Sequence, residues 1–202
     1  MLSAADIDPR VGDALAVIYD LDRPRLASVD YMTAYGIDIN RVARHCGCPT
    51  VLPIMLLPNR RFDMPDGHGA ESTEGCVIEA RAEDGETVID LVAWPISNPR
   101  NVRSLIGAVS ILGLSQAFNA STYVFGYPLV VHRTPLAWLQ ADCHGAAVVI
   151  PDFAARTFLE IADFGGRIGA EDFDHARELR RHLDAMTKCV EIVAPKSIRR
   201  VA

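Results

Sequence analysis

Lysine, cysteine and long apolar runs are scarce in this sequence. Lys188 and Lys196 are the only lysines, so arginine supplies almost all of the 20 basic residues, against 26 acidic ones. The net charge of −6 argues against a protein that coats nucleic acid over its whole surface. No apolar run reaches the length of a membrane span, and the beginning, MLSAADIDPR, lacks the features of a signal peptide. We therefore expect a cytoplasmic location and no membrane partner.

Signatures of known active sites and metal centres are also absent. The chain contains no GxSxG, HExxH, paired CxxC or dinucleotide-binding motif. Its 5 cysteines are odd in number, and their spacing suggests no disulfide framework. The tightest group of metal-ligand types, His45-Cys46-Gly47-Cys48, separates its cysteines by a single residue, whereas paired zinc ligands usually lie about two to four residues apart. These absences predict no catalytic residues, no metal and no cofactor.

Hydrophobic residues make up 50% of the 202 residues, which is enough for the core of one domain. We divide this domain, 1–202, into a helical N-terminal segment at 1–50 and a mixed α/β core at 51–202. In the N-terminal segment, apolar spacing and capping residues predict helices at 11–21, at 29–35 after Ser28, and at 39–45 after Asp38.

The first part of the core reads as extended structure. We expect a strand at 51–57, a long polar loop at 59–75, and a hairpin of strands 76–82 and 87–94 around Asp84-Gly85. Asp90 interrupts an apolar run in this hairpin, and we expect it to face solvent. The apolar stretch 105–118 fits a helix or a strand equally well.

The stretch from Tyr127 to Asp152 is the centre of the predicted fold. Leu129 to Val131 is an apolar, β-branched run typical of a buried strand. Thr134-Pro135 is a helix-start signal, and Gly145 is a natural stop before a second apolar run at 146–150. The pattern predicts a strand-helix-strand unit.

If those two strands are parallel, their carboxyl ends share one edge of the sheet, where open sheets bind ligands. The residues at that edge would be His132, Arg133, Thr134 and Asp152. An arginine beside a helix start suits an anion, so these four residues form our candidate ligand site. The alternative is that Thr134 and Asp152 are only helix caps and Arg133 is solvated. An antiparallel pair would move Asp152 to the far edge.

Two basic helices offer a different site. The helices around Gly36 outline a helix-turn-helix, with Arg41 and Arg44 on the second helix. Near the C-terminus, a strong helix at 172–186 carries a basic face of Arg177, Arg180 and Arg181, followed by a strand at 189–193. Either set could contact nucleic acid, although an ordinary solvated surface explains both as well.

The motifs Asp90-Leu91-Val92-Ala93-Trp94 and His132-Arg133-Thr134-Pro135-Leu136-Ala137-Trp138-Leu139 resemble those of a group of proteins encoded in proteobacterial genomes and their mobile elements. The resemblance covers the middle and C-terminal parts of the chain. It implies no activity, since none is established for that group. Some members occur near phage-type replication genes, and the resemblance therefore only adds weight to the hypothesis of a partner in DNA metabolism.

Together these features predict an α+β fold with a mixed sheet and small N-terminal helices. The leading functional hypothesis is a non-enzymatic accessory or interaction protein that binds a small anionic ligand at His132, Arg133 and Thr134 or a protein partner through the loop 59–75. The alternative is a DNA-binding or DNA-metabolism accessory protein. A weaker alternative is a hydrolase of a phosphate-containing substrate.

Overall fold

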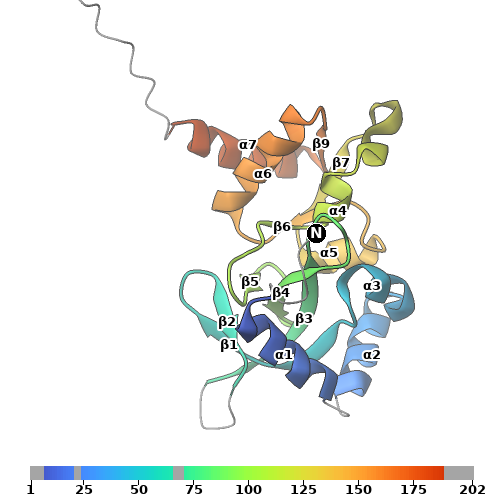
Figure 1. Cartoon of the computed structure of the whole chain (residues 1–202), viewed down its shortest axis with the longest axis vertical. Helices are drawn as coiled ribbons and strands as arrows, with labels where there is room; N and C mark the ends of the chain where they lie inside the picture. Colours follow the sequence, from blue (N-terminus) through green and yellow to red (C-terminus); the bar gives the residue numbers. More distant parts are fainter. Residues whose placement is uncertain (1–6, 21–23, 66–70, 189–202) are drawn as a thin grey trace, which may run out of the picture.

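The computed structural model describes residues 7–20, 24–65 and 71–188. In this part the chain is an α+β protein with two mixed β-sheets, which confirms the expected fold class (Figure 1). One sheet is a closed barrel surrounded by the N-terminal helices, and the other is an open sheet with helices on both faces. No helix of the described part is long and apolar enough to cross a membrane.

Five strands form the barrel: β1 (Thr50–Leu57), β2 (Arg61–Asp63), β3 (Thr73–Arg81), β4 (Val88–Pro95) and β5 (Arg103–Ser104). They close in the order β1-β2-β5-β4-β3, with β2 and β5 parallel and every other pair antiparallel. The predicted β3–β4 hairpin is confirmed. The predicted loop 59–75 is wrong at both ends, because Phe62 turns into the barrel and β3 already begins at Thr73.

The barrel interior is filled by alternating apolar residues of its strands. Helix α1 (Pro9–Asp20) packs Val11 and Ala14 against this interior. A buried carboxylate fixes the same helix, since Glu79 of β3 accepts a hydrogen bond from the hydroxyl of Tyr19 and pairs with Arg81 at 2.7 Å. Burial and this hydrogen bond raise the pKa of Tyr19 to about 12.

Helices α2 (Pro24–Ala34) and α3 (Ile39–Cys46) pack on the outside of the barrel. The cap of α3 is confirmed, because Asp38 accepts from the backbone N–H of Asn40 at 2.9 Å. The expected cap of α2 is wrong. The helix begins at Pro24, so Ser28 lies inside it, and its buried hydroxyl accepts from the N–H of Val51 instead.

The open sheet has the strand order β6-β8-β7-β9. Its strands are β6 (Ile111–Leu112), β7 (Leu129–His132), β8 (Ala146–Val148) and β9 (Ile168–Ala170). The short helices α4 (Leu114–Ala117) and η2 (Ala120–Gly126) connect β6 to β7, so the stretch 105–118 contains both a strand and a helix. The predicted strand at 189–193 lies outside the described residues.

Helix α5 (Pro135–Gln140) joins β7 to β8, which confirms the central strand-helix-strand unit. Its Leu136, Trp138 and Leu139 belong to a core shared with the outer face of the barrel. Helices α6 (Pro151–Asp163) and α7 (Phe173–Lys188) cover the opposite face of the open sheet (Figure 1). The space between barrel and open sheet is therefore filled by α5 and its neighbours.

Asp90 is fully buried, so the expectation that it faces solvent is wrong. Its carboxylate accepts from the hydroxyl of Ser104 at 2.6 Å and from the N–H groups of Leu91, Ile106 and Ala108 at 2.8, 3.0 and 2.8 Å. Such a set of donors compensates the loss of water around a buried carboxylate. Asp90 thereby fixes the chain that follows β5.

Candidate functional site

The carboxyl edge of the open sheet is built as the sequence indicated. β7 and β8 are parallel, with Val131 opposite Ala146 and His132 opposite Ala147. Thr134 caps α5, since its Oγ1 accepts from the N–H of Ala137 at 3.1 Å. The Thr134 hydroxyl therefore caps the helix and orients the turn after β7. Thr134 does not line the cavity described next.

A cavity of about 210 Å³ lies at this edge, between the open sheet and the turns of the barrel. Its charged and ionisable lining consists of three arginines, three histidines and one glutamate: Arg60, Arg100, Arg133, His132, His175, His182 and Glu178. We call it the arginine–histidine pocket. A cationic pocket on a chain with a net charge of −6 is a local feature that overall composition did not indicate.

Asp152 does not line this pocket, although its neighbour Pro151 does. Helix α6 begins at Pro151, and Ile150 holds the cap position without a side-chain hydrogen bond. Asp152 is therefore an exposed residue of the first turn, and the expectation that it caps α6 is wrong. The structure brings together His132 and Arg133 of the four predicted ligand residues.

His132 is held on both ring nitrogens. Its Nδ1 lies 3.1 Å from Oε1 of Glu171, and its Nε2 lies 2.9 Å from the carbonyl oxygen of His144. Both partners are acceptors, so only the doubly protonated imidazolium can donate to both at once. The two contacts thus fix the orientation of the ring at the end of β7.

Arg133 connects β7 to the start of α7. Its Nη2 donates to Oδ1 of Asp172 at 2.5 Å, and its Nε lies 3.5 Å from Oε2 of Glu171. The Arg133 side chain is 26% exposed, so one face of the guanidinium remains accessible from solvent. Two neighbouring carboxylates therefore position this arginine and partly neutralise it.

His175 and His182 come from the face of α7 that carries the buried Leu179. Nδ1 of the buried His175 accepts from the N–H of Glu171 at 3.4 Å, which leaves the proton of a neutral ring on Nε2. Burial lowers the pKa of His175, and the charge of Arg133 lowers it further. His175 is therefore the neutral, buried donor of the pocket.

Arg60 and Arg100 complete the pocket from turns of the barrel. Arg60 lies between β1 and β2, and Arg100 lies between β4 and β5. Within the described part of the chain, neither side chain forms an ion pair or hydrogen bond with a protein partner. Two guanidinium groups therefore line the pocket without an ion-pair partner among the described residues, although Glu178 lies in the same lining.

The backbone at Arg60 is strained. Asn59 and Arg60 have φ angles of 55° and 56°, in the left-handed region. Asparagine tolerates this region, but for arginine it costs about 1 kcal/mol. The two residues lie in the tight turn between Leu57 and Arg61, and this turn brings the Arg60 side chain to the pocket. Strained residues of this kind are frequent at functional sites.

A second cavity, of about 370 Å³, adjoins the first and shares Arg60 and Arg100 with it. Its other lining residues are Asn98, Asn101 and Arg103, and we call it the arginine–asparagine pocket. Burial lowers the pKa of Arg103, and the like charge of Arg60 lowers it further, although a guanidinium stays cationic in proteins. The two cavities form a continuous cationic surface.

The basic residues of the alternative nucleic-acid hypothesis lie elsewhere. Arg41 on α3 pairs with Asp142 at 2.6 Å, and Arg177 on α7 pairs with Asp174 at 3.1 Å. Arg180 borders an apolar groove between β9 and α7. Helices α3 and α7 are far apart in the molecule, so Arg44 and Arg181 do not join one surface either (Figure 1).

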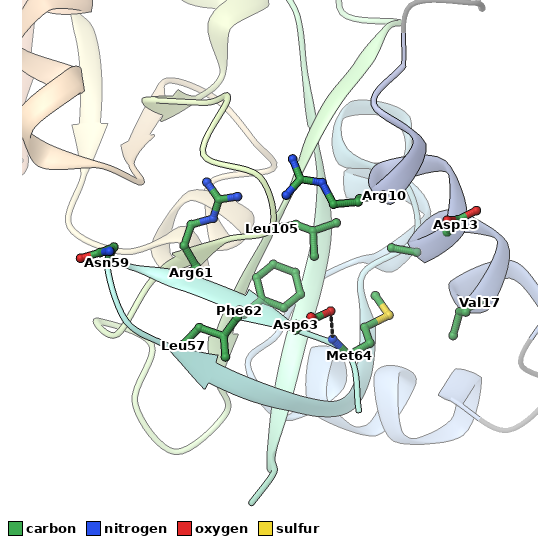
Figure 2. A pocket seen from close by; sticks show the side chains of 11 residues that line it. Arg10, Asp13, Val17, Leu57, Asn59, Arg61, Phe62, Asp63, Met64 and Leu105 are labelled. Atoms are coloured by element: carbon green, nitrogen blue, oxygen red, sulfur yellow. Dashed lines mark hydrogen bonds between the residues drawn. The ribbon is translucent and has the colours of Figure 1, made fainter. Parts of the chain in front are cut away.

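A larger cavity, of about 690 Å³, is a groove between α1 and the barrel. Its floor contains Phe62, Met64 and Leu105, and Figure 2 shows Arg10 and Arg61 pointing toward the same side of it. Two arginines and two aspartates line this groove, and Arg10 is already paired with Asp8 at 3.0 Å. Its charges balance, so it lacks the selective chemistry of the cationic pockets.

Neither a protein family, a curated protein nor a solved structure matches this chain.

Proposed function

We propose that this protein binds a phosphate-bearing anionic ligand in the arginine–histidine pocket and acts as a binding module. The observation behind this proposal is that Arg60 and Arg100 enter a pocket with Arg133 and three histidines but have no carboxylate partner in the described part of the chain. One glutamate in the lining does not balance three arginines, and a bound anion relieves the repulsion between guanidinium groups that have no ion-pair partner.

The chemistry of the lining favours phosphate. Guanidinium groups offer pairs of N–H donors that match the oxygens of phosphate and carboxylate. The cavity is too small to enclose a drug-sized ligand, which usually needs at least about 300 Å³. A volume of about 210 Å³ is suited to one phosphate group and its first neighbours.

The lining supports binding more directly than catalysis. His132 is held by two acceptors and Thr134 by the start of α5, so neither is free as a nucleophile or base. The hydrolase alternative would therefore depend on His175 or His182.

A cytoplasmic location belongs to the same proposal, since the cysteines of the described part carry free thiols, including Cys46 and Cys143 with sulfurs 3.9 Å apart.

Thermal unfolding with inorganic phosphate tests the proposal. A ligand at ten times its dissociation constant stabilises the folded state by about 1.4 kcal/mol, which raises the midpoint by a few degrees. We expect this shift in the unmodified protein, a reduced shift in Arg60→Gln and Arg100→Gln, and an unchanged shift in Arg156→Gln. Arg156 is a matched control, because it is 76% exposed on α6 and pairs with Glu160 outside the pocket. No shift in the unmodified protein would refute the proposal.

A further inference from the structure

The arginine–asparagine pocket presents hydrogen-bond donors. Oδ1 of Asn98 accepts from the N–H of Arg100 at 3.3 Å, and Oδ1 of Asn101 accepts from Nε of Arg103 at 3.0 Å. With both amide oxygens occupied, each asparagine has its NH₂ group left to donate. The side-chain groups left for a ligand are thus amide donors and guanidinium groups, which suit an anion and oppose a cation.

Arg60 and Arg100 belong to both cavities, so the two anion sites are neighbours. Each cavity also has donors of its own: Arg133, His175 and His182 on one side, Arg103 and the asparagines on the other. A ligand that uses all of these groups must carry at least two linked phosphates. A single phosphate would leave one cavity with uncompensated charge.

The lining also limits how a base could be bound. The only aromatic rings in the lining of the two cavities are the imidazoles of three histidines, and no phenylalanine, tyrosine or tryptophan offers a larger surface for the stacking on which base binding usually depends. The smaller cavity of about 210 Å³ is also a tight fit for a nucleoside. These features favour contacts to a phosphate backbone whose bases stay outside the groove.

We propose that the two cavities together bind the phosphodiester backbone of a single-stranded nucleic acid, independently of its sequence. This inference rests on the proposed phosphate binding and extends it to the class of ligand. It places the contact at Arg60 and Arg100, on turns of the barrel, and at Arg103 of β5, and not on the basic faces of α3 or α7.

Fluorescence anisotropy with labelled dT12 and rU12 tests this assignment. About three phosphate contacts predict that log K falls with log salt concentration at a slope of about −2, a loss of about fifteenfold in affinity between 50 and 200 mM salt. Arg100→Gln should reduce the slope by about 0.7 and weaken binding about fivefold at 100 mM salt. Arg177→Gln on α7 is the control, and we expect it to bind like the unmodified protein.

Asn98→Asp separates the two proposals. The aspartate keeps the oxygen that accepts from Arg100, but it replaces the NH₂ donor by a negative charge in the arginine–asparagine pocket. We expect about tenfold weaker oligonucleotide binding, while the thermal shift with inorganic phosphate in the other pocket is retained.

The outcomes are distinguishable. A phosphate shift without oligonucleotide binding at 50 mM salt would overturn this inference and leave the proposed function standing. Oligonucleotide binding that Arg177→Gln weakens but Asn98→Asp and Arg100→Gln do not would also overturn it, in favour of α7. Pyrophosphate or ATP that binds more tightly than either oligonucleotide would assign the groove to a small ligand instead. Loss of both signals would refute both proposals.

Discussion

Asp172 holds the guanidinium of Arg133 at 2.5 Å and, with the same Oδ1, accepts the N–H of His175 at 2.9 Å. The carboxylate thus serves two purposes, because it caps the first turn of α7 and pairs with an arginine of the candidate site. These hydrogen bonds and the charge of Arg133 lower the pKa of Asp172. Any anion that enters the pocket competes with this carboxylate for Arg133.

Asp172→Asn should therefore bind phosphate more tightly. Asparagine caps helices as well as aspartate does, so the variant removes the charge and keeps the cap. Because an exposed ion pair contributes about 0.2–1 kcal/mol, we expect an affinity gain of up to about fivefold by calorimetry. Asp174→Asn, which removes a neighbouring exposed charge that pairs with Arg177, should leave the affinity unchanged. A weaker affinity in Asp172→Asn would contradict the role given to Arg133.

Arg60→Gly should make the protein more stable and at the same time weaken its binding of phosphate. Glycine adopts a φ of 56° without steric cost, so the variant relieves the turn and should raise the free energy of unfolding by up to about 1 kcal/mol. It also removes one of the two unpaired guanidinium groups, so phosphate affinity should fall. Urea unfolding and calorimetry measure the two effects. A less stable variant would contradict the strain at Arg60, and an unchanged phosphate affinity would contradict the role of its guanidinium in the pocket.

Asp90→Asn should destabilise the protein strongly. Both carboxylate oxygens accept a backbone N–H, so an amide NH₂ in either place meets a donor and leaves buried groups unsatisfied. We expect a loss of about 2–4 kcal/mol in urea unfolding. Asp63→Asn, on an exposed residue of the barrel, should change stability by less than about 0.5 kcal/mol. Equal effects of the two variants would contradict the importance of the buried network.

Stability should fall as the pH drops below about 6.5, the ordinary pKa of histidine. Burial lowers the pKa of His175 and of His45, so near pH 6 the unfolded chain binds more protons than the folded chain. The free energy of unfolding then increases with pH between about 5 and 7. Thermal midpoints across this range should show a shallower slope in His175→Gln than in the unmodified protein. An identical slope would mean that His175 is not the responsible group.

The central unit could be predicted because its signals are local. An apolar run, a threonine-proline helix start and a glycine stop lie within about twenty-five residues, and they determine where His132 and Arg133 appear. Parallel pairing then brought the strand ends to one edge. The placement of Asp152 was wrong because the helix already begins at Pro151, so the aspartate is an exposed residue of its first turn.

The rest of the pocket is formed by segments that are distant in the sequence and meet only in the folded protein. Arg60 and Arg100 lie in turns that reach the open sheet only because the five strands form a barrel, and no local pattern marks either residue. The burial of Asp90 could not be predicted for the same reason, since two of its hydrogen-bond donors come from a loop that follows β5. His175 and His182 did leave a signal, because both share a helix face with the apolar Leu179.

The most direct test of the central claim is to follow the histidine side chains by NMR during a titration with inorganic phosphate. If the anion occupies the arginine–histidine pocket, the ring resonances of His175 and His182 should shift with one common dissociation constant. The resonances of His45, on α3, should stay in place. Rings of His175 and His182 that do not respond, or a response of His45 equal to theirs, would contradict binding at this pocket.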